Sequence, residues 1–221
     1  MATLISIQAG RPQNLGGAGG VEPWDRQWRT AFFKTPLLGS VEVGRLNVAG
    51  DRQADLRVHG GPDMAVLCYS ADHYPTWRAE LGIADIGPGG FGENFTIESL
   101  DEWSACIGDV YSVGSAVVEV SQQRRPCYKI GYRWKRADLL ERVEKSGRHG
   151  WYVRVLEEGT VEAGMPVLLV ERRNPRWTVR RAADVYRASA QDAVTAAELA
   201  RIPGYAAGPR RRLEVAIERA H

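Results

Sequence analysis

The chain has 221 residues, of which 44% are hydrophobic and 25% are charged, a balance typical of a folded globular protein and not of a disordered one. It has no run of 18 apolar residues, its first residues lack the features of a signal peptide, and its three cysteines are too few and too far apart for a disulfide framework. The formal net charge is only +2. We therefore expect a cytoplasmic protein without a membrane span.

The first part of the chain predicts strands with one helix among them. Residues 3–10 alternate between apolar and polar positions and end in glycine, and residues 39–51 have a strand pattern that leads into a turn. Between these strands, the Gly-rich and Trp-rich residues 10–30 predict a surface excursion. Residues 70–82 have helical spacing, with Ser70 as a possible cap, Gly82 as a possible end, and Pro75 disturbing the first turn.

Short strands also dominate the middle of the chain, interrupted by an amphipathic helix at residues 136–147. Many short strands separated by close turns favour a barrel or sandwich over a doubly wound sheet. These further strands are predicted at residues 65–70, 94–99, 106–114, 116–122 and 165–172.

The chain changes character at Pro175. Three helical segments follow, at residues 178–189, 192–201 and 209–220; Ser189 or Asp192 can cap the second, and Pro209 suits the first turn of the third. Residues 171–221 contain 11 Arg and 6 acidic residues, giving +5, whereas 18 basic and 21 acidic residues give the rest −3. We expect a mainly β protein with helices (α+β), made of a β-rich body at residues 1–170 and a three-helix appendage at residues 175–221.

Several common active-site signatures are absent from the sequence. There is no P-loop, no H-E-x-x-H or C-x-x-C metal motif, and no G-x-S-x-G turn. The four histidines are scattered, and "GPGGFGEN" does not match the dinucleotide fingerprint. A conventional zinc enzyme, kinase or serine hydrolase is therefore not expected.

The segment "GDRQADLRVHGGPDMAV", residues 50–66, combines charges, a histidine and paired glycines. Gly60 and Gly61 can adopt backbone angles that turn successive N–H groups toward an anion. Arg57 and His59 would point the same way on an extended chain. A charged hairpin with a Gly-Gly-Pro turn is the alternative. The acidic residues able to orient Arg57 and His59 are Asp51, Asp55 and Asp63.

A second segment, "GGFGENFT" at residues 89–96, places Glu93 and Asn94 in a tight turn. The alternative to a binding role is a plain turn that the Asn94 side chain stabilises.

A third segment, "QQRRPCYKIGYRW" at residues 122–134, surrounds Cys127 with cations. Arg124, Arg125 and Lys129 lie within three residues of it, and nearby cations favour the reactive thiolate. Pro126 stiffens the approach. Cys127 is therefore the candidate reactive cysteine, although a small buried hydrophobe is the common state of a free cysteine. Cys68 has apolar neighbours and is expected in the core.

Together with "CIGDVYSVGSAVVEVSQ" and "GWYVRVLEEGTVEAG", these motifs, in this order, resemble the MOSC domain proteins and, among them, the YiiM-type subgroup. The resemblance covers about residues 30–170, and the helical tail resembles the C-terminal three-helix domain of the subgroup. It implies a MOSC-type β-barrel that binds the molybdenum cofactor, with Cys127 ligating the metal. The implied activity is reduction of N-hydroxylated compounds such as hydroxylaminopurines, with electrons from a separate flavoprotein reductase.

The resemblance gives the candidate residues their expected roles. A soft thiolate suits molybdenum, arginine and backbone N–H groups suit the cofactor phosphate, and Asn suits the pterin edge. Asp63 or Glu93 would deliver protons. This chain differs from the family pattern at Met64, Gln123 and Tyr128. The family commonly has a cation at position 64, and its loss here would affect an anion contact or the substrate preference, but not the metal ligand. The expected cofactor-binding residues are Arg57, His59, Gly60, Gly61, Asn94, Arg124 and Lys129.

Other interpretations of these segments stay open. Cys127 could carry a persulfide in a sulfur-carrier or cofactor-handling protein. The basic tail could bind nucleic acid, an interpretation we rank last because three short helices show no clear recognition pattern. We expect the tail to border the cleft and to dock the redox partner, with a homodimer contact or plain stabilisation of the barrel as alternatives.

Overall fold

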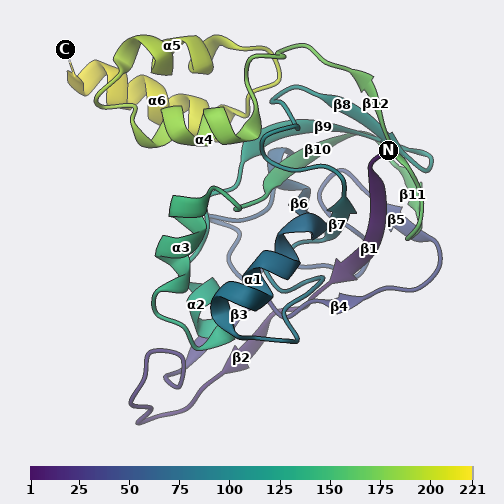
Figure 1. Cartoon of the computed structure of the whole chain (residues 1–221), viewed down its shortest axis with the longest axis vertical. Helices are drawn as coiled ribbons and strands as arrows, with labels where there is room; N and C mark the ends of the chain where they lie inside the picture. The colour runs from purple at the N-terminus through teal and green to yellow at the C-terminus, as the bar shows by residue number, and fades with distance from the viewer. Residues whose placement is uncertain (221) are drawn as a thin grey trace.

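The computed structural model describes residues 1–220 (Figure 1). His221 lies outside them. The six α-helices of this part are α1 (Tyr74–Leu81), α2 (Lys129–Trp134), α3 (Leu139–Ser146), α4 (Val179–Arg187), α5 (Ala193–Arg201) and α6 (Ala207–Ala220). Its strands are β1 (Thr3–Ala9), β2 (Gln13–Leu15), β3 (Trp28–Thr30), β4 (Thr35–Pro36), β5 (Val41–Val43), β6 (Val66–Ser70), β7 (Phe95–Glu98), β8 (Val110–Val113), β9 (Ala116–Gln123), β10 (Trp151–Glu157), β11 (Gly159–Val161) and β12 (Val167–Glu171).

Eight strands form one curled sheet in the order β12-β8-β9-β10-β6-β7-β1-β4. Every neighbouring pair is antiparallel except β6 and β7, which run parallel. The sheet curls far enough for β1 to meet the segment before β12, where Thr3 bridges Pro166 and the Leu4 N–H donates to the Met165 carbonyl at 2.9 Å. This half-barrel with helices confirms the predicted α+β class.

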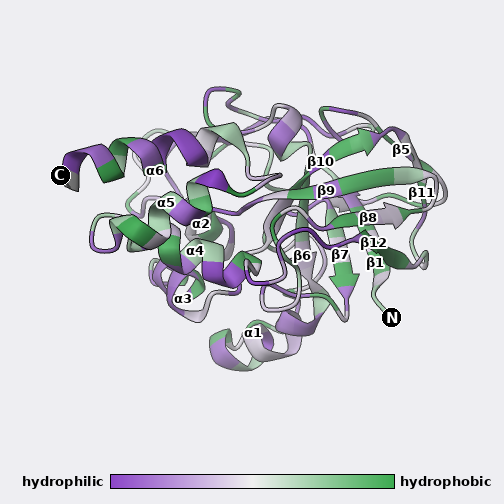
Figure 2. Cartoon of the chain, turned by 90° about the horizontal axis from the view of Figure 1, so that it is seen from above, coloured by the Kyte–Doolittle hydropathy of each residue, from purple (hydrophilic) through white to green (hydrophobic). Residues whose placement is uncertain are grey.

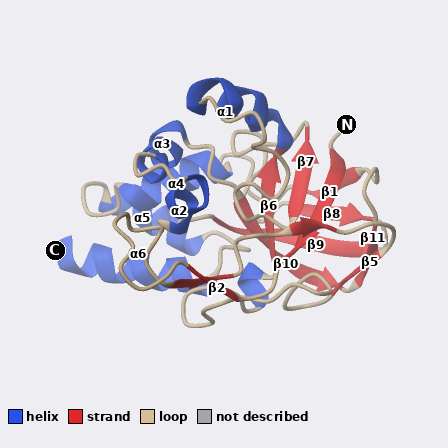
Figure 3. Cartoon of the chain, turned by 90° about the horizontal axis from the view of Figure 1, so that it is seen from below, coloured by secondary structure: helices blue, strands red, loops and turns tan. Residues whose placement is uncertain are grey.

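The core fills the concave side of the sheet. The sequence of strand β10 explains this packing. Its buried positions, Trp151, Val153 and Val155, alternate with less buried ones, as expected for a strand with one face in the core. The strands carry much of the hydrophobic sequence (Figure 2) and lie on one side of the molecule, with most helices on the other (Figure 3). A second apolar cluster, which includes Tyr69, Trp77 and Phe91, packs beneath α1 to α3.

The three C-terminal helices begin close to the predicted positions. The Thr178 hydroxyl caps α4 by accepting from the Arg181 N–H at 3.1 Å, and Asp192, one of the two expected caps, accepts from the Thr195 N–H at 3.0 Å before α5. The helices share the core of the sheet through residues such as Val179 on α4 and Leu199 on α5. The tail is therefore packed on the barrel, and its separate domain status stays a prediction.

Several elements differ from the sequence prediction. Strand β10, helix α2 and the short β2–β3 hairpin were not predicted, and the hairpin lies in the stretch expected to be irregular. The first helix has the expected irregular start: a 3₁₀ turn at Ala71–His73 leads into α1, with Pro75 in its first turn, and Gly82 ends it in the left-handed conformation. Ser70 makes no side-chain cap. No helix within residues 1–220 is long and apolar enough to cross a membrane.

Candidate functional site

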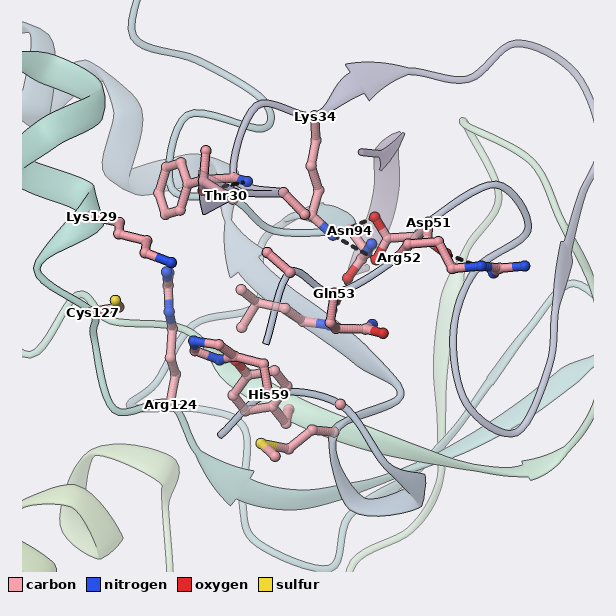
Figure 4. A pocket seen from close by; sticks show the side chains of 18 of the residues that line it. Thr30, Lys34, Asp51, Arg52, Gln53, His59, Asn94, Arg124, Cys127 and Lys129 are labelled. Atoms are coloured by element: carbon pink, nitrogen blue, oxygen red, sulfur yellow. Dashed lines mark hydrogen bonds and ion pairs between the residues drawn. The ribbon is translucent and has the colours of Figure 1, made fainter. Parts of the chain in front are cut away.

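A hollow opens beside the end of β9, and four segments that are distant in sequence line it (Figure 4). The curled sheet supplies the wall around Leu67 and Tyr152, and loops supply the remainder. The lining residues of the four segments are Thr30, Ala31, Phe32 and Lys34; Asp51 to Ala54 with His59, Gly60 and Met64; Gly92 and Asn94; and Arg124, Arg125, Cys127 and Lys129.

Cys127 lies half-buried in this hollow with two cations nearby. Arg124 is 5% exposed, and its backbone N–H donates to the Gly150 carbonyl at 3.1 Å, which fixes the main chain just after β9. Lys129 begins α2 and donates from Nζ to the Arg29 carbonyl at 2.8 Å. In Figure 4 the Lys129 and Arg124 side chains point toward one another, with Cys127 to one side. Two like charges held this close favour an anion between them.

His59 faces the same cations. Burial lowers the pKa of its imidazole, and the positive charges of Arg124 and Lys129 lower it further. An imidazole with a lowered pKa is mainly neutral at pH 7, so it can accept a hydrogen bond from a ligand or donate one without adding charge.

A buried ion pair forms the opposite wall. The Lys34 ammonium lies 2.8 Å from both carboxylate oxygens of Asp51, whose Oδ1 also accepts from the Gly10 N–H at 2.8 Å. Both side chains are nearly inaccessible, with 9% and 1% exposed. Burial lowers the pKa of Lys34 although the Asp51 charge opposes that shift. From the sequence, Asp51 was expected only as a possible partner of Arg57 or His59, and Lys34 was not predicted to be a site residue.

Asn94 lines the hollow, but its side chain also holds the sheet together. Its Nδ2 donates to the Gln8 carbonyl at 3.1 Å, and its Oδ1 accepts from the Leu67 N–H at 3.2 Å. The amide therefore joins β1 to β6 and presents its edge to the hollow from a fixed position.

Glu93 has a different place from the one expected of a proton donor. It is fully buried, and it does not line the hollow. Its carboxylate accepts from the Gly89 N–H at 2.7 Å, the Phe91 N–H at 3.1 Å and the Thr96 hydroxyl at 2.9 Å, and also from the Tyr74 hydroxyl. The side chain shapes the 89–96 turn, so the assignment as a proton donor is corrected to a structural one.

Asp63 is also directed away from the hollow. Its Oδ1 pairs with Arg154 at 2.9 Å, and its Oδ2 accepts from the Ala207 N–H at 3.3 Å at the start of α6. The carboxylate ties the C-terminal helix to the sheet, which corrects its expected role as a proton donor.

Arg57 and Gly61 do not line the hollow, whereas His59 and Gly60 do. The Arg57 guanidinium pairs with Asp55 at 2.8 Å on the outside, and 88% of its side chain is exposed. The cause is the local backbone: the His59 N–H donates to the Asp55 carbonyl at 3.1 Å, so the segment is a turn and residues two apart do not share a side. Gly60 and Gly61 both have positive φ, 87° and 89°.

No described residue of the tail lines the hollow, and the tail approaches it only through a contact with one lining residue, so its expected place beside the cleft stays a prediction. Arg125 lines the hollow, and its guanidinium lies 5.7 Å from the centre of the Tyr186 ring on α4. Within residues 1–220, no group of three or more His, Cys, Asp and Glu side chains is arranged to hold a metal ion by itself.

Buried histidines make stability depend on pH. Burial lowers the pKa of His149, against the opposing Glu102 charge, and its Nδ1 bonds the Gly150 carbonyl at 2.8 Å. An unfolded histidine has a pKa near about 6.5, so below that pH the unfolded chain binds more protons than the folded one. This contribution to stability is complete above about pH 6.5 and is lost as the pH falls toward the lower folded-state pKa.

We expect His149→Asn, which can keep a donor toward Gly150, to lose less stability on acidification than the wild type. Between pH 7.5 and 5.5 the wild type should lose up to about 1.4 kcal/mol per pH unit from this site. Urea unfolding across that range measures the slopes, and equal slopes in both proteins would contradict the assignment of a neutral buried His149.

Comparison with known proteins identifies the class. A family model described as "MOSC domain" matches residues 55–168, which is more than half of the chain. The chain therefore belongs to the MOSC domain family.

Similarity to individual proteins places the chain within that family. It is 36% identical to Protein YiiM of Escherichia coli over 149 residues, 65% of each chain. The crystal structure of YiiM from Geobacillus stearothermophilus superimposes with a TM-score of 0.81 at 29% identity, covering 98% of this chain and all of that one. This is a YiiM-type MOSC protein.

Two further relatives carry other names. The chain is 40% identical to the uncharacterized protein YflK of Bacillus subtilis over 170 residues, which covers 77% of this chain and 74% of YflK. It is 36% identical over 205 residues to a protein of Gibberella moniliformis named "Reductase". That match covers 90% of this chain but only 35% of the Gibberella protein, so this chain corresponds to about a third of it.

Proposed function

We propose that this protein is a molybdenum-cofactor-dependent oxidoreductase that reduces N-hydroxylated compounds, with electrons supplied by a separate flavoprotein reductase. The MOSC family and the relative named reductase support an oxidoreductase-like role. The observation that carries the finer proposal is the placement of the half-buried Cys127 thiol in one hollow with Arg124, Lys129 and His59.

The chemistry of these side chains fits the cofactor. Among the described residues that line the hollow, Cys127 supplies the thiol, and a thiolate is the soft ligand that a dithiolene-bound molybdenum accepts. Arg124 and Lys129 offer charged donors of the kind that bind phosphate. Asn94 and the Lys34–Asp51 pair offer fixed polar edges for a pterin.

Each residue has a binding or orienting role in this account. Cys127 would hold the metal, and the Arg124 guanidinium, which donates to the His149 carbonyl at 3.5 Å, would hold an anionic group beside it. The neutral His59 would accept or donate one hydrogen bond beside them. When bound, the cofactor would supply the two-electron change that a protein side chain cannot supply.

The overall reaction determines which electrons, protons and products must enter or leave the site. An N–OH group, two electrons and two protons give an N–H group and one water molecule, as the N–O bond breaks. The electrons come from the reductase. Since Asp63 and Glu93 are committed to structural contacts, neither is the proton source in this account.

The proposal is tested with protein produced in a cofactor-competent host. We expect hydroxylaminopurine to be converted to adenine with a small artificial electron donor. Cyanolysable sulfur on Cys127, without reduction of any N-hydroxylated compound, would instead support the sulfur-carrier alternative and overturn the proposal.

The tail provides a surface for the proposed reductase. Arg211 and Arg212 are exposed on α6 beside Val215, and neither has an ion-pair partner in the described part of the chain. Together with the tail charge of +5, these arginines would steer an acidic flavoprotein toward the tail, whose Tyr186 contacts the lining residue Arg125.

Because the tail shares the core of the sheet, charge substitutions test docking better than deletion of the tail. In the Arg211→Gln/Arg212→Gln variant we expect the rate with an acidic flavoprotein reductase to fall by roughly 3- to 10-fold at low salt and to become less salt-dependent. The rate with dithionite should not change. Arg11→Gln, at an exposed arginine of the body, is the control. An unchanged, still salt-sensitive rate in the tail variant would rule out docking there.

A further inference from the structure

Glu102 is a fully buried acidic residue that does not line the hollow. It belongs to the connection between β7 and β8. Its Oε1 accepts from the Gly150 N–H at 2.5 Å, and its Oε2 lies 2.6 Å from His73 Nε2. Burial disfavours the charge, yet the bond to His73 and then the bond to Gly150 hold the pKa of the carboxyl below its usual value. Glu102 therefore presents an ionised acceptor to the Gly150 N–H.

Gly150 is held in a backbone conformation that requires glycine. Its φ is 82°, and a Cβ at this position would meet the Cys68 carbonyl oxygen at 2.5 Å. The Gly150 carbonyl accepts from the Arg124 backbone N–H at 3.1 Å and bonds His149 Nδ1 at 2.8 Å. Residues 149 and 150 are therefore fixed next to the end of β9, where the hollow opens.

One peptide group joins the Glu102 carboxylate to the Arg124 guanidinium. The peptide between His149 and Gly150 donates its N–H to Glu102, and its carbonyl accepts from Arg124 Nη1 at 3.5 Å. A peptide group is planar, so the position of its N–H determines the direction of its carbonyl. Within residues 1–220 this carbonyl is the hydrogen-bond acceptor that the Arg124 guanidinium has in the protein. The Arg124 side chain extends from there toward Lys129 (Figure 4).

We propose that Glu102 is a positioning residue for anion binding in the hollow: it fixes the His149–Gly150 peptide, whose carbonyl holds the Arg124 guanidinium in place. This inference rests on the anion-binding role that the proposed function gives to Arg124, and not on the reaction. The charges act in the same direction, because a carboxylate at the N–H end and a guanidinium at the carbonyl end polarise the peptide and strengthen both bonds.

The test is the binding of inorganic phosphate to the full chain prepared without cofactor, measured by isothermal titration calorimetry. We expect Glu102→Ala to weaken phosphate binding by roughly 10-fold, since groups that orient a ligating side chain commonly contribute 10- to 100-fold. Glu102→Gln keeps an acceptor for the Gly150 N–H and should bind phosphate within about threefold of the wild type. Circular dichroism checks that each variant is folded at the temperature of the titration.

Asp109→Ala is the matched control. Asp109 is an equally buried carboxylate in the same connection, and it accepts from the Cys106 N–H and the Tyr111 hydroxyl, each at 2.9 Å. The control should lose stability but bind phosphate as the wild type does. If Glu102→Ala does not fold, Glu102→Asp takes its place, because the shorter carboxylate cannot reach both His73 and Gly150.

The outcomes separate the positioning role from the proposed reaction. Wild-type phosphate affinity in a folded Glu102→Ala or Glu102→Asp, an equal loss in Asp109→Ala, or no saturable phosphate binding by the wild type would overturn the positioning role. Glu102-dependent phosphate binding in a protein that, when loaded with cofactor, reduces no N-hydroxylated compound would keep the positioning role and overturn the reaction.

Discussion

Cys127→Ser is expected to abolish reduction of N-hydroxylated substrates while the protein stays folded. Loss of groups that merely support a metal ligand commonly costs 10- to 100-fold, so loss of the ligand itself should cost more than about 100-fold in rate. The side chain is half-buried and at the end of β9, outside the apolar core, so a hydroxyl is tolerated there. Turnover of hydroxylaminopurine together with a thermal melt measures both effects.

Cys68→Ser is the matched control for this variant. Cys68 lies in the core on β6 with 2% of its surface exposed, and burial raises the pKa of its thiol. A buried hydroxyl there should lower the free energy of unfolding by about 1–3 kcal/mol and leave the rate of the folded enzyme unchanged. Near wild-type activity in Cys127→Ser with molybdenum bound would contradict the assignment of Cys127 as the ligand.

Glu93→Ala is expected to have the largest effect on stability. The substitution removes the acceptor of four buried donors, two backbone N–H groups of the 89–96 turn and the hydroxyls of Tyr74 and Thr96. Each buried donor left without a partner costs about 1–3 kcal/mol, and partial relaxation limits the total. We expect the free energy of unfolding, measured with urea, to fall by about 3–5 kcal/mol.

Two further variants serve as comparisons for Glu93→Ala. Tyr74→Phe removes one of the four donors and should cost less than Glu93→Ala. Glu98→Ala removes an exposed glutamate from the end of β7 and should change stability by less than about 0.5 kcal/mol. A loss below 1 kcal/mol in Glu93→Ala would show that the carboxylate does not organise the turn, since about 3–5 kcal/mol is expected.

The fold class followed from features that act locally along the chain. Alternation and glycine turns marked most strands, and Thr178, Asp192 and Gly82 acted at helix ends as their chemistry requires. Strand β10 was missed although Trp151, Val153 and Val155 carry the period of a half-buried strand; the residues between them are Tyr152 and the charged Arg154. The Arg154 guanidinium forms ion pairs with Asp63 and Glu119, so a charged side chain at this position is compatible with a strand.

The site was predictable where sequence neighbours stay neighbours in space. Arg124, Cys127 and Lys129 line one hollow because β9 ends and α2 begins within a few residues. The expectation for Arg57 failed because it assumed an extended chain where the structure has a turn. The Lys34–Asp51 pair could not be predicted, since its partners come from separate loops that only the tertiary fold brings together.

The most direct test of the account is the molybdenum and pterin content of purified protein from a cofactor-competent host, compared between the wild type and Cys127→Ser. The account predicts molybdenum and pterin in near-equal amounts in the wild type, and a variant that retains pterin but holds molybdenum more weakly on dialysis. A wild type that carries neither molybdenum nor pterin when a known molybdoenzyme from the same host is fully loaded would contradict it.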